Sequence, residues 1–364
     1  MKEFKIQFTE AQFDDLRSRL EHVRLPTRTD DSFQYGIGGR LLQELLDQWA
    51  DYDWQPTQNA LNAYDQYLCD LDGMQVHFFH IPAQQPDAAT VLLCHGWPDS
   101  FLRYAKLFGR MPDCNLVVPS LPGFAFSTLP ASGYSNNSAV SEVWFHLMRD
   151  VLGYQRFIVS GGDMGRGVAC YMAVNHPEEV CGLHLTDVGL VRDLISHPEQ
   201  GLSAEELDYK HRAEDWLRLE GAYMNIQSTK PQTLSFALAD SPAALAAWLG
   251  EKYHAWSDWE RFSSSDLLAA LTLSWMTNSG ATSVRMYHGN SFDLPPLDLQ
   301  DLKTPVGITA FPKDVLPAPR AWIEQNYPVI RYDVMDYGGH FTALENPTGF
   351  AESLRGFIAD LGRA

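Results

Sequence analysis

Apolar positions from residue 74 onwards fall into short continuous runs, and segments with helical spacing lie between them. Strands that are buried on both faces have this continuous apolar character, whereas half-exposed strands alternate. The pattern therefore predicts an α/β fold in which helices flank a mostly parallel sheet. The predicted strands are Met74–Ile81, Thr90–Cys94, Asn115–Pro119, Arg156–Ser160, Val180–Leu185, Val306–Phe311 and Val329–Val334.

The spacing of apolar positions divides the chain into four regions. A helical meander comes first, and Thr9 and Gln12 form a predicted capping box in it. The α/β core follows, and a long segment of helical spacing interrupts it, with Ser241-Pro242 at one helix start. Because ligands bind at the carboxyl edge of open parallel sheets, this insertion is expected to form a lid there. The meander, the first part of the core, the lid and the second part of the core are predicted at residues 1–73, 74–190, 191–300 and 301–364.

The charge of the chain restricts its partners. The 364 residues include 27 Lys+Arg and 46 Asp+Glu, so the formal net charge is −19. Nucleic acids and anionic membranes bind cationic surfaces, and both are therefore disfavoured as partners. A chain of this length forms two domains, or one large domain that carries insertions.

Two further features bear on the compartment. The start of the sequence lacks the apolar segment of a signal peptide, and no stretch approaches the ~20 apolar residues of a membrane span. The five cysteines form no Cys-x-x-Cys pair, and Cys94, Cys170 and Cys181 lie in or beside apolar runs. We therefore expect a cytoplasmic protein with buried reduced thiols and without a metal site.

A glycine-rich turn carries the first candidate for chemistry. Gly161-Gly162-Asp163-Met164-Gly165 lies between a predicted strand and a predicted helix. It has the Gly-x-nucleophile-x-Gly pattern of a nucleophile elbow, with Asp163 in the nucleophile position. Glycine is expected at both ends because a side chain there would clash in so tight a turn. Taken alone, the same residues also fit an aspartate that caps a helix.

An aspartate nucleophile implies a reaction in two steps. Its carboxylate is ionised at neutral pH and can attack an sp³ carbon, which gives an ester that water must hydrolyse with the help of a base. His340, in a Gly-Gly-His-Phe segment after the last predicted strand, is the predicted base. Asp314 follows the preceding strand and is the predicted acid that orients His340. Asp187 is the runner-up, and Asp336 and Glu345 are weaker candidates because they lie so close to His340 in sequence.

The segment His95-Gly96-Trp97-Pro98 follows another predicted strand. The backbone N–H groups of Trp97 and Met164 are expected to form an oxyanion hole. His95, Pro98 and Met164 are expected to line the substrate pocket, and Trp97–Pro98 is a candidate cis peptide bond.

Along essentially its whole length the chain resembles the microsomal-type branch of the epoxide hydrolases. The resemblance rests on the N-terminal segment through Trp54 and Asn62, on the motifs above, and most specifically on the phrase YMNIQSTKP at residues 223–231. It implies an α/β-hydrolase core with a helical lid and an N-terminal meander. It also implies conversion of an epoxide and water to a vicinal diol through a covalent aspartate ester, with Asp163, His340 and Asp314 as nucleophile, base and acid.

The same resemblance assigns a role to two lid tyrosines, Tyr223 and Tyr287, which would donate hydrogen bonds to the epoxide oxygen as the ring opens. The chain departs from the family at three positions: Met164 replaces the usual Trp, Arg166 replaces a small residue, and Asp314 replaces the Glu of some members. The implied partner is a small-molecule epoxide, and no cofactor or metal is implied. The protein could be a monomer or a symmetric homodimer.

Two alternatives remain on the same fold. Haloalkane dehalogenases share the aspartate ester, but they usually bind halide through a Trp after the nucleophile and have Asn at the position of Trp97; Met164 has no such donor. A non-catalytic receptor for small ligands often lacks a catalytic residue, whereas the whole set is present here. A serine esterase is disfavoured because Asp163 occupies the nucleophile position.

Overall fold

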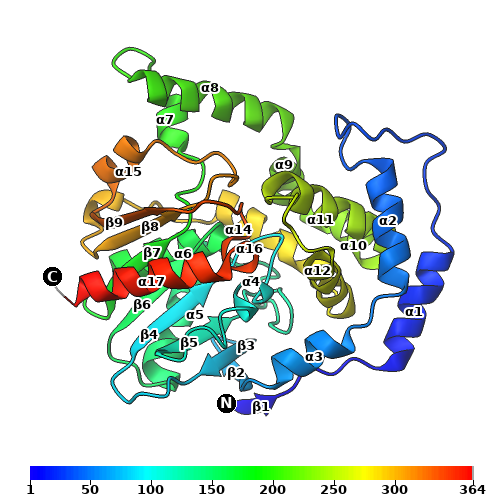
Figure 1. Cartoon of the computed structure of the whole chain (residues 1–364), viewed down its shortest axis with the longest axis horizontal. Coiled ribbons are helices and arrows are strands. Elements are labelled where there is room, and N and C mark those ends of the chain that lie inside the picture. Colours follow the sequence, from blue (N-terminus) through cyan, green and yellow to red (C-terminus); the bar gives the residue numbers. More distant parts are fainter. Residues whose placement is uncertain (363–364) are drawn as a thin grey trace.

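A mixed β-sheet forms the centre of the molecule in the computed structural model, which describes residues 1–362 (Figure 1). Over these residues the sheet has nine strands in the order β1-β2-β3-β5-β4-β6-β7-β8-β9. The strands from β5 to β9 in this order are parallel, and β1, β2 and β3 add an antiparallel edge. The strands are β1 Lys2–Phe4, β2 Gln66–Leu71, β3 Met74–Ile81, β4 Ala89–Cys94, β5 Cys114–Pro119, β6 Phe157–Gly161, β7 Val180–Leu185, β8 Val306–Ala310 and β9 Val329–Val334.

The seven predicted strands are confirmed as β3 to β9, with ends that differ by at most one residue. The prediction did not include β1 and β2, since β1 is only three residues long and β2 continues an amphipathic stretch. A hairpin turn at Asp72-Gly73 joins β2 to β3, and both residues have positive φ angles, 47° and 76°. An Asp-Gly pair between two strands is a recognised hairpin signal, so the sequence did contain evidence for β2.

Helices cover both faces of the parallel part of the sheet (Figure 1). One helix, α6, packs on β4, β6 and β7 with α5 against it, while α17 packs on β7, β8 and β9. A Cβ atom at Gly307 of β8 would lie 2.6 Å from the Phe357 ring of α17, so this glycine allows close packing. The core helices are α4 Leu102–Ala105, α5 Asn137–His146 with a π-helical continuation at Leu147–Val151, α6 Met164–Asn175, α15 Arg320–Asn326, α16 Thr342–Glu345 and α17 Pro347–Leu361.

Between β7 and β8 the chain is helical, as the spacing of its apolar residues predicts. Ser241 caps the start of α11 by accepting a hydrogen bond from the N–H of Ala244, with Pro242 in the first turn. The exact boundaries of the predicted lid domain stay a prediction. The helices of this segment are α7 Arg192–Ser196, α8 Ala204–Leu219, α9 Ala222–Thr229, α10 Pro231–Asp240, α11 Pro242–Trp256, α12 Ser264–Met276, α13 Ser279–Thr282 and α14 Met286–Phe292, with 3₁₀ turns at Ser283–Arg285 and Leu299–Asp301.

The N-terminal helices pack against this lid segment. α1 and α2 contact α11, and α2 also contacts α12. Trp49 on α2 is buried, and its indole N–H donates to the hydroxyl of Thr272 on α12 at 2.9 Å. The capping box of Thr9 and Gln12 is confirmed at the start of α1. The N-terminal helices are α1 Glu10–Glu21, α2 Gly39–Ala50 and α3 Gln55–Asn62.

The cysteines are all free thiols. Cys94 and Cys170 are buried as expected, whereas Cys181 is only partly buried. Among the described residues, every helix is too short or too polar to cross a lipid bilayer.

Candidate active site

The carboxyl ends of four neighbouring strands bring the predicted site residues together. Asp163 follows β6, Asp187 follows β7, Asp314 follows β8 and His340 follows β9. Because these parallel strands all end at one edge of the sheet, loops that are far apart in sequence meet there. The sheet therefore gathers every predicted nucleophile, base and acid in one place.

Asp163 lies in a tight turn between β6 and α6. Its φ of 54° and ψ of −128° are unusual for a residue that carries a side chain. A Cβ atom on Gly161 would overlap the carbonyl of Gly165, and one on Gly165 would overlap the carbonyl of Cys94. Close backbone packing thus accounts for the glycines at both ends of the elbow.

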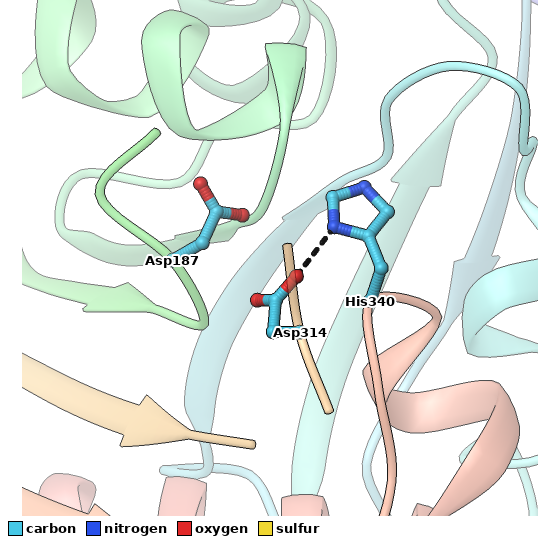
Figure 2. Close-up of side chains that lie close together, drawn as sticks. All are labelled: Asp187, Asp314 and His340. Atoms are coloured by element: carbon cyan, nitrogen blue, oxygen red, sulfur yellow. Dashed lines mark hydrogen bonds and ion pairs between the residues drawn. The ribbon is translucent and has the colours of Figure 1, made fainter. Parts of the chain in front are cut away.

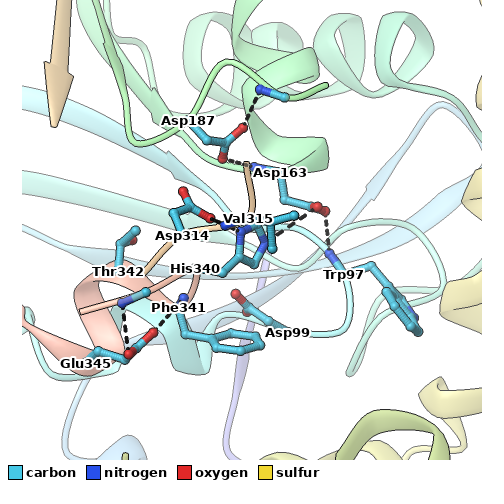
Figure 3. Close-up of polar contacts among 12 residues, drawn as sticks. Trp97, Asp99, Asp163, Asp187, Asp314, Val315, His340, Phe341, Thr342 and Glu345 are labelled. Carbon is cyan, nitrogen blue, oxygen red and sulfur yellow. Dashed lines mark hydrogen bonds and ion pairs between the residues drawn. The ribbon is translucent and has the colours of Figure 1, made fainter. Parts of the chain in front are cut away.

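The two carboxylate oxygens of Asp163 have different neighbours (Figure 3). Oδ1 accepts a hydrogen bond from the backbone N–H of Trp97 at 2.8 Å, and the N–H of Met164 also bonds this carboxylate. Oδ2 lies 3.6 Å from Nε2 of His340. Burial would raise the pKa of Asp163, but His340 and the two N–H donors outweigh it and hold the pKa below its usual value. The carboxylate is therefore ionised, with one oxygen held by the backbone.

His340 lies between two carboxylates. Its Nδ1 donates to Oδ1 of Asp314 at 2.8 Å, and its Nε2 faces Asp163. Across the described part of the chain, this buried Nε2 has no hydrogen-bond partner. Burial lowers the pKa of His340, but the charge of Asp314 and the contact with Asp163 outweigh it and raise the pKa to about 10. The imidazole is thus oriented by Asp314 and aimed at Asp163.

Asp187, the runner-up for the acid, has a different set of partners. It accepts hydrogen bonds from the backbone N–H groups of Asp163 at 2.6 Å and Gly189 at 2.9 Å. Burial, followed by the nearby charge of Asp314, raises its pKa. Its place in the structure is that of a support for the elbow, while Asp314 is the carboxylate that bonds His340.

Asp187, Asp314 and His340 also form the cluster that could offer ligand atoms to a metal ion (Figure 2). One atom from each lies within 4.8 Å of the others. Hydrogen bonds already engage these groups, since Asp314 bonds His340 and Asp187 accepts two backbone N–H groups. The cluster is therefore accounted for by the arrangement of the base and the elbow.

A cavity of about 610 Å³ opens beside the Asp163 carboxylate. Met164 lines it as predicted, whereas His95 and Pro98 are not among its described lining residues. His95 is fully buried, and its Nε2 accepts the backbone N–H of Leu121 at 3.1 Å, so its role is structural. The Trp97–Pro98 peptide bond is cis as predicted. The apolar wall of the cavity was not predicted from the sequence; it is formed by Leu190, Trp216, Met224, Trp256, Leu294 and Val315.

Tyr223 on α9 and Tyr287 on α14 both line this cavity, with ring centroids 5.8 Å apart. The indole of Trp97 stacks on Tyr223 at 5.3 Å and meets Tyr287 edge-on at 5.7 Å. Burial raises the pKa of both phenols well above the ordinary value, and the charge of Asp163 adds to this effect. Both side chains are therefore neutral hydrogen-bond donors.

The loop that carries His340 is supported by a buried ion pair that was not predicted from the sequence. Asp99 and Arg103 are paired in the core, and Nη1 of Arg103 donates to the carbonyl oxygen of His340 at 2.9 Å. The i,i+4 spacing of these residues was visible in the sequence. Spacing indicates a pair on one helix face, but it does not indicate burial.

Arg166, which replaces a small residue of the family, lies beside the elbow and lines the cavity. A Cβ atom on Gly189 would lie 2.6 Å from Nη2 of Arg166, so the guanidinium packs on this turn. Burial would lower the pKa of Arg166, but Tyr327, Cys170 and Asp187 outweigh it and raise the pKa. The positive charge of Arg166 in turn favours the ionised form of Asp187.

Known proteins match this chain along nearly all of its length. The family described as "Epoxide hydrolase N terminus" matches residues 1–104, and the family described as "alpha/beta hydrolase fold" matches residues 89–253. Epoxide hydrolase 1 of Sus scrofa is 31% identical over 98% of this chain and 88% of its own length.

Two solved structures are similar to this chain. The epoxide hydrolase of Aspergillus niger superposes with a TM-score of 0.88 at 30% identity and covers 99% of this chain and 96% of its own. The juvenile hormone epoxide hydrolase of the silkworm Bombyx mori has a TM-score of 0.85 at 26% identity and covers 100% of this chain and 94% of its own.

The fold and the elbow define an α/β hydrolase with an aspartate in the nucleophile position. The matches to the N-terminal segment and to full-length relatives narrow this class. The chain belongs to the microsomal-type epoxide hydrolases, and its activity is the hydrolysis of epoxides. The resemblance found in the sequence is thereby confirmed.

Proposed function

We propose that Oδ2 of Asp163 attacks an epoxide carbon and forms a covalent ester. The C–O bond of the ring breaks as the new bond forms, and negative charge develops on the epoxide oxygen. The hydroxyl groups of Tyr223 and Tyr287 donate hydrogen bonds to this oxygen and supply the proton that makes it an alcohol. The substrate is thus held between the elbow and the two lid tyrosines.

Water hydrolyses the ester in the second step. Esterification removes the negative charge of Asp163, and the proton held by His340 then neutralises the phenolate. Neutral Nε2 of His340 next takes a proton from a water molecule, which attacks Cγ of Asp163. Negative charge then moves to Oδ1, where the N–H groups of Trp97 and Met164 stabilise it. Collapse breaks the bond between Cγ and Oδ2. His340 returns a proton to the departing oxygen, the diol leaves, and Asp163 passes its remaining proton to Nε2 of His340, which restores the starting state.

The observation that carries this proposal is the unequal environment of the two Asp163 oxygens. Oδ1 already lies where an oxyanion would form, 2.8 Å from the Trp97 nitrogen, and Oδ2 faces a histidine nitrogen that has no other partner. Asp314 holds the other nitrogen of His340, which suits a base that must act toward Asp163.

Isotope labelling tests the ester directly. With enzyme in excess over epoxide in H₂¹⁸O, the first turnover should give a diol without label, because its new oxygen comes from Asp163. Repeated turnover should give labelled diol. Label in the first turnover would mean direct attack by water, and the nucleophile assignment would then be wrong.

Two variants separate the steps. Asp163→Ala should abolish diol formation, and substantial residual turnover would contradict the role of Asp163. His340→Gln should form the ester but hydrolyse it slowly, so intact-mass spectrometry should find protein with the added mass of the substrate. Normal turnover by His340→Gln would show that another group is the base.

The dehalogenase and receptor alternatives are tested in the same assay. A panel of epoxides beside short haloalkanes should give diol and no halide, because Met164 offers no side-chain donor for a halide ion. The self-association of two copies stays a prediction, and light scattering of the purified protein would measure it.

A further inference from the structure

The segment that carries His340 has no regular structure of its own. It lies between the end of β9 at Val334 and the start of α16 at Thr342. The backbone N–H of His340 donates to the carbonyl of Trp256, at the end of the lid helix α11, at 2.7 Å. The position of the imidazole therefore depends on contacts between this segment and its surroundings.

The carboxylate of Glu345 accepts hydrogen bonds from backbone N–H groups on both sides of His340. Oε2 of Glu345 accepts the N–H of Gly339 at 3.0 Å, and its Oε1 accepts the N–H of Phe341 at 2.9 Å. Oε2 also accepts the N–H of Asp258, just beyond α11, at 2.7 Å. Figure 3 shows Glu345 facing the segment from the opposite side to Asp163.

This arrangement joins three backbone N–H groups from two segments through one side chain. The residues before and after His340 and the lid segment at Asp258 share the same acceptor. Hydrogen bonds from N–H groups to a carboxylate are stronger than those to neutral oxygens, and partly buried N–H groups would lose them without replacement. Glu345 does not bond the imidazole, whose Nδ1 is taken by Asp314.

We infer that Glu345 is a positioning residue for ester hydrolysis and acts through His340. The inference rests on the proposed role of His340 as the base. Ester formation uses Asp163 and the two lid tyrosines, none of which Glu345 contacts, whereas hydrolysis needs Nε2 of His340 within reach of a water molecule beside Asp163. Loss of the Glu345 acceptors should therefore affect the two steps unequally.

Single-turnover kinetics of Glu345→Gln test whether ester hydrolysis slows more than ester formation. The amide keeps one oxygen but presents an NH₂ group to backbone donors. A displacement of a catalytic group by about 1 Å can cost a factor of about 100 in rate. We expect ester hydrolysis to slow by about 10- to 100-fold while ester formation changes less than about threefold, so that the ester accumulates and is detected by intact mass.

The conservative variant and a matched control complete the design. Glu345→Asp keeps the charge and should restore part of the hydrolysis rate. Glu206→Gln removes a carboxylate that accepts the backbone N–H of Ser203 at 2.8 Å outside the cavity, and both rates should stay unchanged. Equal loss of both steps in Glu345→Gln, or no accumulation of ester, would overturn the inference.

His340→Gln, measured in parallel, distinguishes an error in the role of Glu345 from an error in the role of His340. If it accumulates ester and folded Glu345→Gln does not, the role of Glu345 is wrong and that of His340 stands. Normal turnover by His340→Gln would remove the basis for both.

Amide hydrogen exchange of the wild-type protein tests the three backbone hydrogen bonds to Glu345 without a substitution. The amides of Asp258, Gly339 and Phe341 should exchange at least tenfold more slowly than expected for an unstructured segment. Exchange at the unprotected rate would overturn the inference even if Glu345→Gln failed to fold.

Discussion

At the residue scale, the proposed steps use different atoms of the site. Oδ1 of Asp163 receives backbone N–H groups, and Oδ2 is directed at His340. The phenols stay neutral because burial raises their pKa. Asp163 is thus ionised and both phenols are protonated before substrate arrives, as the proposed ring opening requires.

The two tyrosines lead to a prediction about ring opening. Replacing both Tyr223 and Tyr287 with Phe removes the proposed donors to the developing alkoxide, while the rings still fill the cavity wall. Loss of an oxyanion donor costs about 100- to 1,000-fold in rate, so ester formation in the double variant should slow by about 1,000-fold or more. Rapid mixing of His340→Gln with and without the two substitutions measures this step.

A tyrosine outside the cavity provides the control for this prediction. Tyr209→Phe alters a buried lid phenol whose oxygen accepts the N–H of Val191 at 3.1 Å, and ester formation should not change. An unchanged ester-formation rate in the double variant would exclude Tyr223 and Tyr287 from ring opening.

The raised pKa of His340 predicts how stability depends on pH. The pKa is about 10 in the folded protein and near 6.5 in the unfolded chain, so the folded state binds the proton more tightly. Its contribution to the free energy of unfolding is complete below pH 6.5 and falls by about 1.4 kcal/mol per pH unit as the pH rises toward 10. Urea unfolding of wild type and His340→Gln at pH 6 to 10 isolates this contribution. A difference in unfolding free energy that stays constant over this range would contradict an imidazolium in the folded site.

At the element scale, the sequence predicted those features that depend on local pattern. Apolar runs located β3 to β9, and the motifs that follow β6, β8 and β9 identified Asp163, Asp314 and His340 as candidates. The flanking glycines could be explained before the structure, because the elbow leaves no room for a side chain. These predictions succeed because residues that follow parallel strands meet at one edge of the sheet.

Other features depend on how elements pack, which spacing along the chain does not encode. Asp187 and Asp314 both follow buried strands, and only the distances show that Asp314 bonds His340 while Asp187 holds the elbow. His95 belongs to a motif at a strand end, yet its ring points into the core. The role of Glu345 as a backbone acceptor was equally hidden, because it depends on the local fold of the segment around His340 and on Asp258, which is distant in sequence.

At the scale of the whole molecule, the N-terminal segment joins the lid to the core. β1 and β2 extend the central sheet, while α1 and α2 pack on the lid helices α11 and α12. The lid supplies Tyr223 and Tyr287, and the core supplies Asp163 and His340. The alignment of the two halves of the site therefore depends on contacts that lie far from the chemistry.

Trp49 tests this dependence because it joins α2 to α12 in a buried contact. Trp49→Ala should lower the free energy of unfolding by about 3–5 kcal/mol, since it leaves a large cavity. Trp49→Phe has a smaller ring and loses the hydrogen bond to Thr272. The lost hydrogen bond should lower the free energy of unfolding by about 1 kcal/mol, in addition to the effect of the smaller ring. Urea denaturation measures both values. We also expect folded Trp49→Ala to form the ester more slowly than Trp49→Phe, because a loosened lid positions the tyrosines less well. Wild-type stability in Trp49→Ala would mean that the N-terminal segment does not brace the lid.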